Sequence, residues 1–177
     1  MKGSIMKIEN RLFLFLLLLL IAAMLSSALS CGESSGPVAR PHVSDDKAPD
    51  FILKDLAGGE FKLSAAKGRP VLLIFLATWC PSCRSEIPHY KDIYETYSRR
   101  GLEVAAIDIE DSKNKVSQFV SKNQIPYRTL LDEKGRVAEA YDITGIPAMI
   151  LIDRDGRIMT RKYFAVDTML ETLLEKK

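Results

Sequence analysis

The order of apolar segments along the chain predicts an α/β fold in which helices cover both faces of a mixed sheet. Residues 71–77 form an unbroken apolar run of β-branched and bulky side chains, which is typical of a strand buried on both faces. Strand-like and helix-like segments alternate after this run, and the chain closes with a hairpin and a helix. The 177 residues leave enough chain for one domain with a substantial core.

The expected elements occupy residues 49–177. A hairpin is expected from strands at 51–56 and 60–63, followed by a short helical turn with Ser64 as its N-cap. The later elements are a strand at 71–77, a helix at 84–100 ended by Gly101, a strand at 102–109, a helix at 112–123 capped by Ser112, an extended piece at 127–131, a helical turn at 135–141, a hairpin of 146–152 and 157–164, and a last helix capped by Asp167 and ending at Lys176. Pro88 lies inside the helix at 84–100, where its missing N–H predicts a kink.

Two cysteines three residues apart, Cys80 and Cys83, follow the buried strand directly. Pro81 lacks an N–H and suits the first turn of the helix that follows. Cys80 is therefore expected at the helix start, where unpaired N–H groups and the positive end of the dipole favour a thiolate. Cys83, one turn further in, is expected to be more buried and to attack Cys80 once Cys80 is joined to a substrate sulfur. The pattern predicts a redox-active disulfide that needs no other cofactor.

A zinc site and a purely structural disulfide are the alternatives for this cysteine pair. A structural zinc ion needs four ligands, and the chain offers only Cys31, His42 and His89 beyond the pair, none at a ligand-like spacing. A structural disulfide that closes so short a loop gains little stability in the chain-entropy model. We therefore expect no metal site.

The first thirty residues predict export. A basic start precedes an apolar core at 12–25 of the length found in signal peptides. Residues 26–32 resemble a bacterial lipoprotein cleavage site, with Cys31 as the lipidated residue and residues 31–48 as its flexible linker. The alternative is an uncleaved helix anchor at 12–29. Both place the domain in the bacterial cell envelope, outside the cytoplasmic membrane, facing the periplasm or the exterior, and tethered.

Charge and cysteine content restrict the partners. Cleavage before Cys31 leaves 147 residues (177 − 30) with 22 basic and 22 acidic side chains, and a chain of near-zero net charge gives no reason to expect nucleic acid as a partner. Cys80 and Cys83 would be the only other cysteines of the exported chain. In an oxidising compartment such a pair becomes oxidised unless another dithiol reduces it, so a reducing partner is implied.

Four segments, at residues 48–56, 68–88, 101–108 and 140–147, resemble the TlpA/ResA-like branch of the thioredoxin superfamily, the membrane-tethered thiol–disulfide oxidoreductases of bacterial envelopes. The resemblance implies a thioredoxin-like mixed sheet with an added N-terminal β-hairpin and an inserted βα unit, which residues 101–123 fit. It also implies a disulfide reductase for exported proteins, apocytochrome c being the best-known target class. A membrane thiol oxidoreductase would supply the electrons.

The resemblance also assigns the substrate side of the site. The superfamily has a cis proline opposite the dithiol, and Pro147 occupies that place. The backbone of Ile146 is then expected to pair with an extended substrate segment. Trp79, beside an exposed nucleophile, is expected to form with Pro81 a flat apolar rim for the substrate, although a lone Trp is more often a core residue.

Acidic residues near the dithiol are the remaining candidates. Thioredoxins proper have a buried Asp six residues before the first cysteine, where this chain has Ile74. Glu86 and Asp111 match positions where ResA-like proteins have acidic residues. We expect Glu86, one turn after Cys83, to accept its proton, with Asp111 as a second acidic modulator. The simpler interpretation of Glu86 is a solvated carboxylate near the positive helix end.

Two other functions fit the fold less well. A thiol peroxidase would have Thr or Ser three residues before the reactive cysteine, and this chain has Ala77 there. A copper chaperone or binding module of this fold spaces its cysteines by three residues and adds a histidine in the second half of the domain, where the chain has none. Both remain alternatives to the disulfide reductase.

Overall fold

A computed structural model describes residues 47–161 and 165–175. The expected signal peptide, Cys31 and the linker up to residue 46 lie outside the described residues, as does Phe164. The strands are β1 (Ile52–Asp55), β2 (Glu60–Lys62), β3 (Val71–Leu76), β4 (Glu103–Ile109), β5 (Arg128–Asp132), β6 (Ala148–Ile152) and β7 (Ile158–Thr160). The helices are η1 (Leu63–Ala66), α2 (Pro81–Tyr97), η2 (Ser98–Arg100), α3 (Lys113–Asn123), α4 (Arg136–Ala140) and α5 (Val166–Glu175).

Within the described residues the seven strands form one mixed sheet in the order β2-β1-β5-β4-β3-β6-β7. The central strands β3, β4 and β5 are parallel, and the pairs on both sides of them are antiparallel. The expected N-terminal hairpin is β1–β2, and the expected βα unit at 101–123 is β4 followed by α3. The predicted mixed sheet is therefore confirmed, and β4 lies directly beside the strand that leads to the dithiol.

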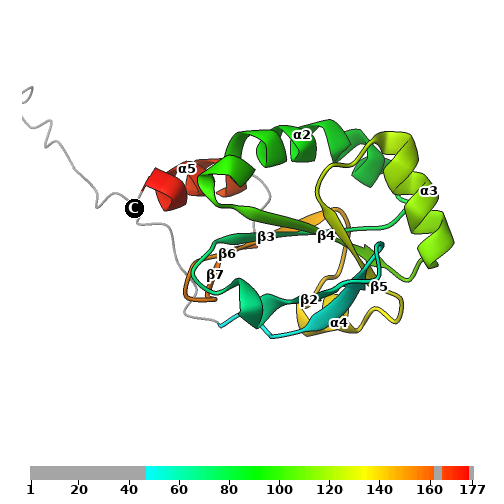
Figure 1. Cartoon of the computed structure of the whole chain (residues 1–177), viewed down its shortest axis with the longest axis horizontal. Helices are drawn as coiled ribbons and strands as arrows, with labels where there is room; N and C mark the ends of the chain where they lie inside the picture. The colour runs from blue at the N-terminus through cyan, green and yellow to red at the C-terminus, as the bar shows by residue number, and fades with distance from the viewer. Residues whose placement is uncertain (1–46, 162–164, 176–177) are drawn as a thin grey trace, which may run out of the picture. The chain divides into compact units, whose positions relative to one another are not determined.

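Helices cover both faces of the sheet, as predicted. Figure 1 shows α2, α3 and α5 on one face and α4 on the other. The side chains of β3 alternate between two core clusters, with Ile74 facing α2 and Phe75 facing α4. Because both of its faces are buried, β3 is apolar throughout.

Two predicted N-caps, Ser64 and Asp167, differ from the structure, and a third, Ser112, is confirmed in position only. Ser64 lies inside η1, and its N–H donates to the Asp50 carboxylate (2.9 Å), so a residue fourteen positions earlier does the capping. Asp167 is also no N-cap, because α5 already begins at Val166 and Asp167 lies in its first turn. Ser112 does occupy the N-cap position of α3, but its side chain makes no capping hydrogen bond. Local cap preferences are weaker than the tertiary contacts that set these helix ends.

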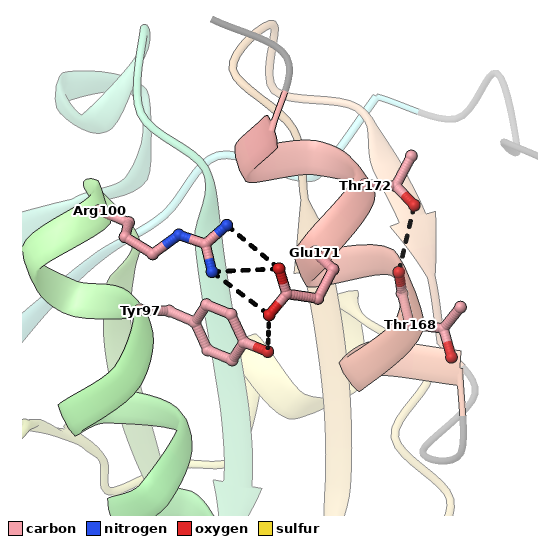
Figure 2. Close-up of polar contacts among 5 residues, drawn as sticks. All are labelled: Tyr97, Arg100, Thr168, Glu171 and Thr172. Carbon is pink, nitrogen blue, oxygen red and sulfur yellow. Dashed lines mark hydrogen bonds and ion pairs between the residues drawn. The ribbon is translucent and has the colours of Figure 1, made fainter.

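The end of α2 remote from the dithiol is fastened to α5. Figure 2 shows the Glu171 carboxylate accepting from the Tyr97 hydroxyl (2.8 Å) and from the Arg100 guanidinium (3.1 Å). The Tyr97 hydrogen bond and the Arg100 contacts lower the pKa of Glu171, whereas burial and then Glu171 raise the pKa of Tyr97. Gly101, in the left-handed conformation at φ 99°, ends the segment as predicted. Among the described helices none is long and apolar enough to cross a bilayer.

Candidate active site

Cys80 and Cys83 form a disulfide at the start of α2, with their Cα atoms 5.3 Å apart. Cys80 is the N-cap residue, and its Sγ accepts the backbone N–H of Cys83 (3.1 Å). The hydroxyl of Ser82 lies 3.2 Å from the same sulfur. Pro81 is the first helical residue, as predicted, and is exposed. After reduction these donors and the helix dipole would stabilise negative charge on Cys80 more than on Cys83.

The two cysteines and the neighbouring tryptophan differ in their exposure to solvent. Cys83 is fully buried and Cys80 is only 3% exposed, so the expectation of an exposed Cys80 is wrong for the oxidised protein. Trp79, in contrast, is 66% exposed. Trp79 is thus exposed next in sequence to a buried disulfide, and its role as an apolar rim for the substrate stays a prediction.

The loop before β6 brings a second segment to the disulfide. The Ile146–Pro147 peptide bond is cis, as expected from the resemblance. The carbonyl oxygen of Ile146 lies 3.9 Å from Cys80 Sγ. Ile146 and Pro147 are both half-buried, so this segment is partly accessible next to the Cys80 sulfur.

Asp111 fixes the loop that carries Trp79. Its Oδ2 accepts both the backbone N–H (2.9 Å) and the hydroxyl (2.7 Å) of Thr78, and Lys115 Nζ lies 3.6 Å from its other oxygen. The Thr78 carbonyl accepts from Arg84 of α2 (2.9 Å). Glu110 has φ 60°, an uncommon conformation for a residue other than glycine, and turns the chain after β4 toward Thr78. Asp111 is therefore near the dithiol as expected, but its carboxylate is engaged in positioning the loop.

Glu86 lies on α2 one turn after Cys83 and is half-buried. This position agrees with the one expected from the sequence. Its role as proton acceptor stays a prediction.

Sequence reasoning missed Asp108, near the end of β4. Its side chain is buried, and within the described residues neither carboxylate oxygen has a hydrogen-bond partner. Burial, with a smaller contribution from the charge of Asp111, raises the pKa of Asp108 to about 7. The available signal was an acidic residue inside a buried apolar strand, where a charge is rarely found without a partner.

The described residues 47–161 and 165–175 contain no group of three or more His, Cys, Asp or Glu side chains arranged to hold a metal ion.

Comparison with protein families and curated proteins gives concordant matches. Residues 44–161 match the model of the AhpC/TSA family. A ResA thiol-disulfide oxidoreductase of Bacillus cereus is 30% identical over 127 residues, which are 71% of this chain and 72% of that protein. The corresponding protein of Geobacillus kaustophilus is 34% identical over 87 residues, 49% of this chain, and this match spans only half of the relative's length.

Solved structures give the same fold. A thiol:disulfide interchange protein of the thioredoxin family from Chlorobium tepidum superposes with a TM-score of 0.63 at 28% sequence identity. The superposition covers 77% of this chain and 98% of that protein.

Proposed function

Because the chain belongs to the AhpC/TSA family and, within it, to the thiol-disulfide oxidoreductases of the ResA type, we propose that it is a disulfide reductase of the bacterial cell envelope. The observation that carries the proposal is the cysteine pair at the start of α2, with Cys80 Sγ facing the carbonyl of Ile146 before a cis proline. Once this disulfide has been reduced, the Cys80 thiolate can attack a substrate disulfide that approaches over Trp79.

In the proposed reaction the reduced protein donates two electrons. The Cys80 thiolate attacks a substrate disulfide, forms a mixed disulfide and releases one substrate thiolate, which takes up a proton. Cys83 then loses its proton and attacks Cys80 Sγ. This step breaks the mixed disulfide, releases the second substrate thiol and leaves the Cys80–Cys83 disulfide. A reducing dithiol of a membrane thiol oxidoreductase returns the pair to the reduced form.

Substrate binding is proposed for four residues around Cys80. The exposed indole of Trp79 and the ring of Pro81 would contact apolar side chains of the substrate. The backbone of half-buried Ile146 would pair with an extended segment of the substrate, and Pro147, which has no N–H, would not compete for that pairing. Exported proteins with disulfides, including apocytochrome c, are the proposed substrate class.

Location in the envelope is proposed from the leader, which lies outside the described residues. Its basic start, apolar core and Cys31 support a lipid anchor on the outer side of the cytoplasmic membrane. Cys31→Ser should abolish metabolic labelling with a radioactive fatty acid. Unchanged labelling of this variant would refute the anchor without affecting the proposed exchange reaction.

The proposed order of attack is tested by trapping. Cys83→Ser should accumulate mixed disulfides through Cys80 when the protein is incubated with a disulfide-bonded substrate, because resolution is blocked. Cys80→Ser should accumulate none, since Cys83 is fully buried. Non-reducing electrophoresis followed by mass spectrometry identifies the bonded cysteine. Trapping through Cys83 would overturn the assignment.

A further inference from the structure

Asp108 lies on the face of the sheet that α2 covers. Side chains alternate along β4, and Val104 and Ala106 belong to the core cluster that contains both cysteines. Asp108, two residues further along, lies on the same face and is in register with Leu76 at the end of β3. Parallel strands end at the same edge of the sheet, and here that edge lies below the start of α2.

The register places Asp108 close to the position of the missing strand carboxylate. Ile74, where thioredoxins proper have an acidic residue, pairs with Ala106. Asp108 lies two residues after Ala106 on the same face of β4, and it is therefore nearer than Ile74 to the end of the sheet from which the chain enters the dithiol helix. A carboxyl group is thus present below α2, supplied by β4 instead of β3.

Asp108 makes no hydrogen bond within the described residues that would give it a role in stabilising the fold. Its side chain is 1% exposed, and within the described residues no donor satisfies either oxygen. The hydroxyl of Thr129, on the same face of neighbouring β5, is also buried and has no partner within the described part of the chain. Buried polar atoms without partners are rare in folded proteins and call for an explanation such as catalysis.

We propose that Asp108 is the group that takes the proton from Cys83 when Cys83 resolves the mixed disulfide. This inference rests on the function proposed above and adds the proton acceptor to it. The Cys83 S–H bond breaks, the proton passes to the ionised Asp108 carboxylate directly or through water, and the Cys83 thiolate attacks Cys80 Sγ. When an external dithiol reduces the disulfide again, protonated Asp108 returns the proton to Cys83.

The titration of Asp108 suits this task. With its pKa raised to about 7, both forms of the carboxyl group are present near neutral pH. The charge that acts on it is that of Asp111, whose own carboxylate is engaged by Thr78 and Lys115. Other titratable side chains on the α2 face are the two cysteines and half-buried Glu86. The tyrosines on this face are Tyr90, Tyr94 and Tyr97 of α2 and Tyr127 before β5.

The test measures the attack by Cys80 and the attack by Cys83 separately. It uses the full chain in detergent solution. The reduced protein is mixed with one equivalent of dithiobis(nitrobenzoate). Attack by Cys80 releases a first coloured thiolate, and attack by Cys83 releases a second. Asp108→Asn should leave the first release unchanged and slow the second about 10- to 100-fold near neutral pH. The difference in the rate of the second release between Asp108→Asn and the wild type should narrow at alkaline pH, where hydroxide from the solvent can take the Cys83 proton.

Matched variants make the result specific. Asp92→Asn makes the same chemical change at an exposed position of α2 and should leave both releases unchanged. If Asp108→Asn resolves at the normal rate, the inference is wrong, and a slow second release in Glu86→Gln would assign the proton to Glu86 instead. If the wild type gives no first release through Cys80, the proposed function itself fails.

A measurement on the unmutated protein covers the case in which Asp108→Asn does not fold. Carboxyl-carbon NMR titration of the oxidised and the reduced protein follows Asp108 in each state. A proton shared with Cys83 requires the Asp108 pKa to differ between the two states, because coupled groups titrate together. An identical Asp108 titration in both states would overturn the proposal.

Discussion

Two buried aspartates, three residues apart at the end of β4, have opposite surroundings. Asp111 is 4% exposed and accepts two hydrogen bonds from Thr78, with Lys115 at 3.6 Å. Asp108 is even more buried, yet within the described residues it accepts none. Asp111 binds Thr78 in the loop that precedes the dithiol helix, and Asp108 lies on the face of the sheet that this helix covers.

The difference shows what each carboxyl group contributes. A buried carboxylate with donors is stable in its charged form and fixes the groups that donate to it. A buried carboxyl group without donors opposes its own ionisation and so titrates near neutral pH, where it can exchange a proton. One aspartate therefore positions the loop at Trp79, and the other is available for chemistry.

The largest expected effect comes from removing the charge of Asp108. An acid whose pKa is raised on folding holds its proton more tightly in the folded chain, so the free energy of unfolding falls as pH rises from about 4 to about 7. Asp108→Asn should remove this decline and stabilise the oxidised protein by about 3 kcal/mol at about pH 8, with little change at about pH 4. Urea unfolding at both pH values measures it. Parallel pH profiles of variant and wild type would contradict the assigned titration.

Asp111→Ala should act in the opposite direction. The variant leaves the Thr78 N–H and hydroxyl without their acceptor, and we expect a loss of about 2 kcal/mol in the free energy of unfolding. Lys115→Ala is the matched control, because Lys115 is largely exposed and its ion pair should contribute less than about 0.5 kcal/mol. Equal losses in the two variants would show that the ion pair, and not the Thr78 contacts, stabilises the loop.

A smaller effect than that of Asp111→Ala is expected for Arg84. Its guanidinium donates to the Thr78 carbonyl from an exposed position, so Arg84→Ala should lower the free energy of unfolding by about 0.5–1 kcal/mol. Trp79 fluorescence reports on the same loop. A red shift in Asp111→Ala, larger than that in Arg84→Ala, would confirm that the buried acceptor dominates, whereas the reverse order would contradict it.

Strands and hairpins were predictable from the sequence where a pattern extends over several consecutive residues. The apolar run at 71–77 and the hairpin at 51–63 identify strands, because burial on both faces or turn chemistry leaves a clear sequence signal. Helix caps were less predictable. Asp50 caps η1 from fourteen residues away from Ser64, a contact that only the folded chain creates.

The candidate site shows the same division. The cysteine motif predicted the place of both sulfurs, and the family resemblance predicted the cis bond at Pro147. Asp108 was not predictable in this way, because the sequence position that carries the acidic residue in thioredoxins lies on β3, at Ile74, and Asp108 belongs to β4. Which strand lies beside β3, and in which register, is decided by tertiary packing.

The contacts of Glu171 with Tyr97 and Arg100 have a mechanical consequence for the dithiol. They hold one end of α2, and its 17 residues, at about 1.5 Å each, separate that end from the sulfurs by about 25 Å. Because α2 is held at its C-terminal end, we expect the disulfide at its N-terminal end to form and break with displacements confined to that end. We therefore expect the making and breaking of the disulfide to move the first turn of α2 and the loop before it, and to leave the far end of the helix in place.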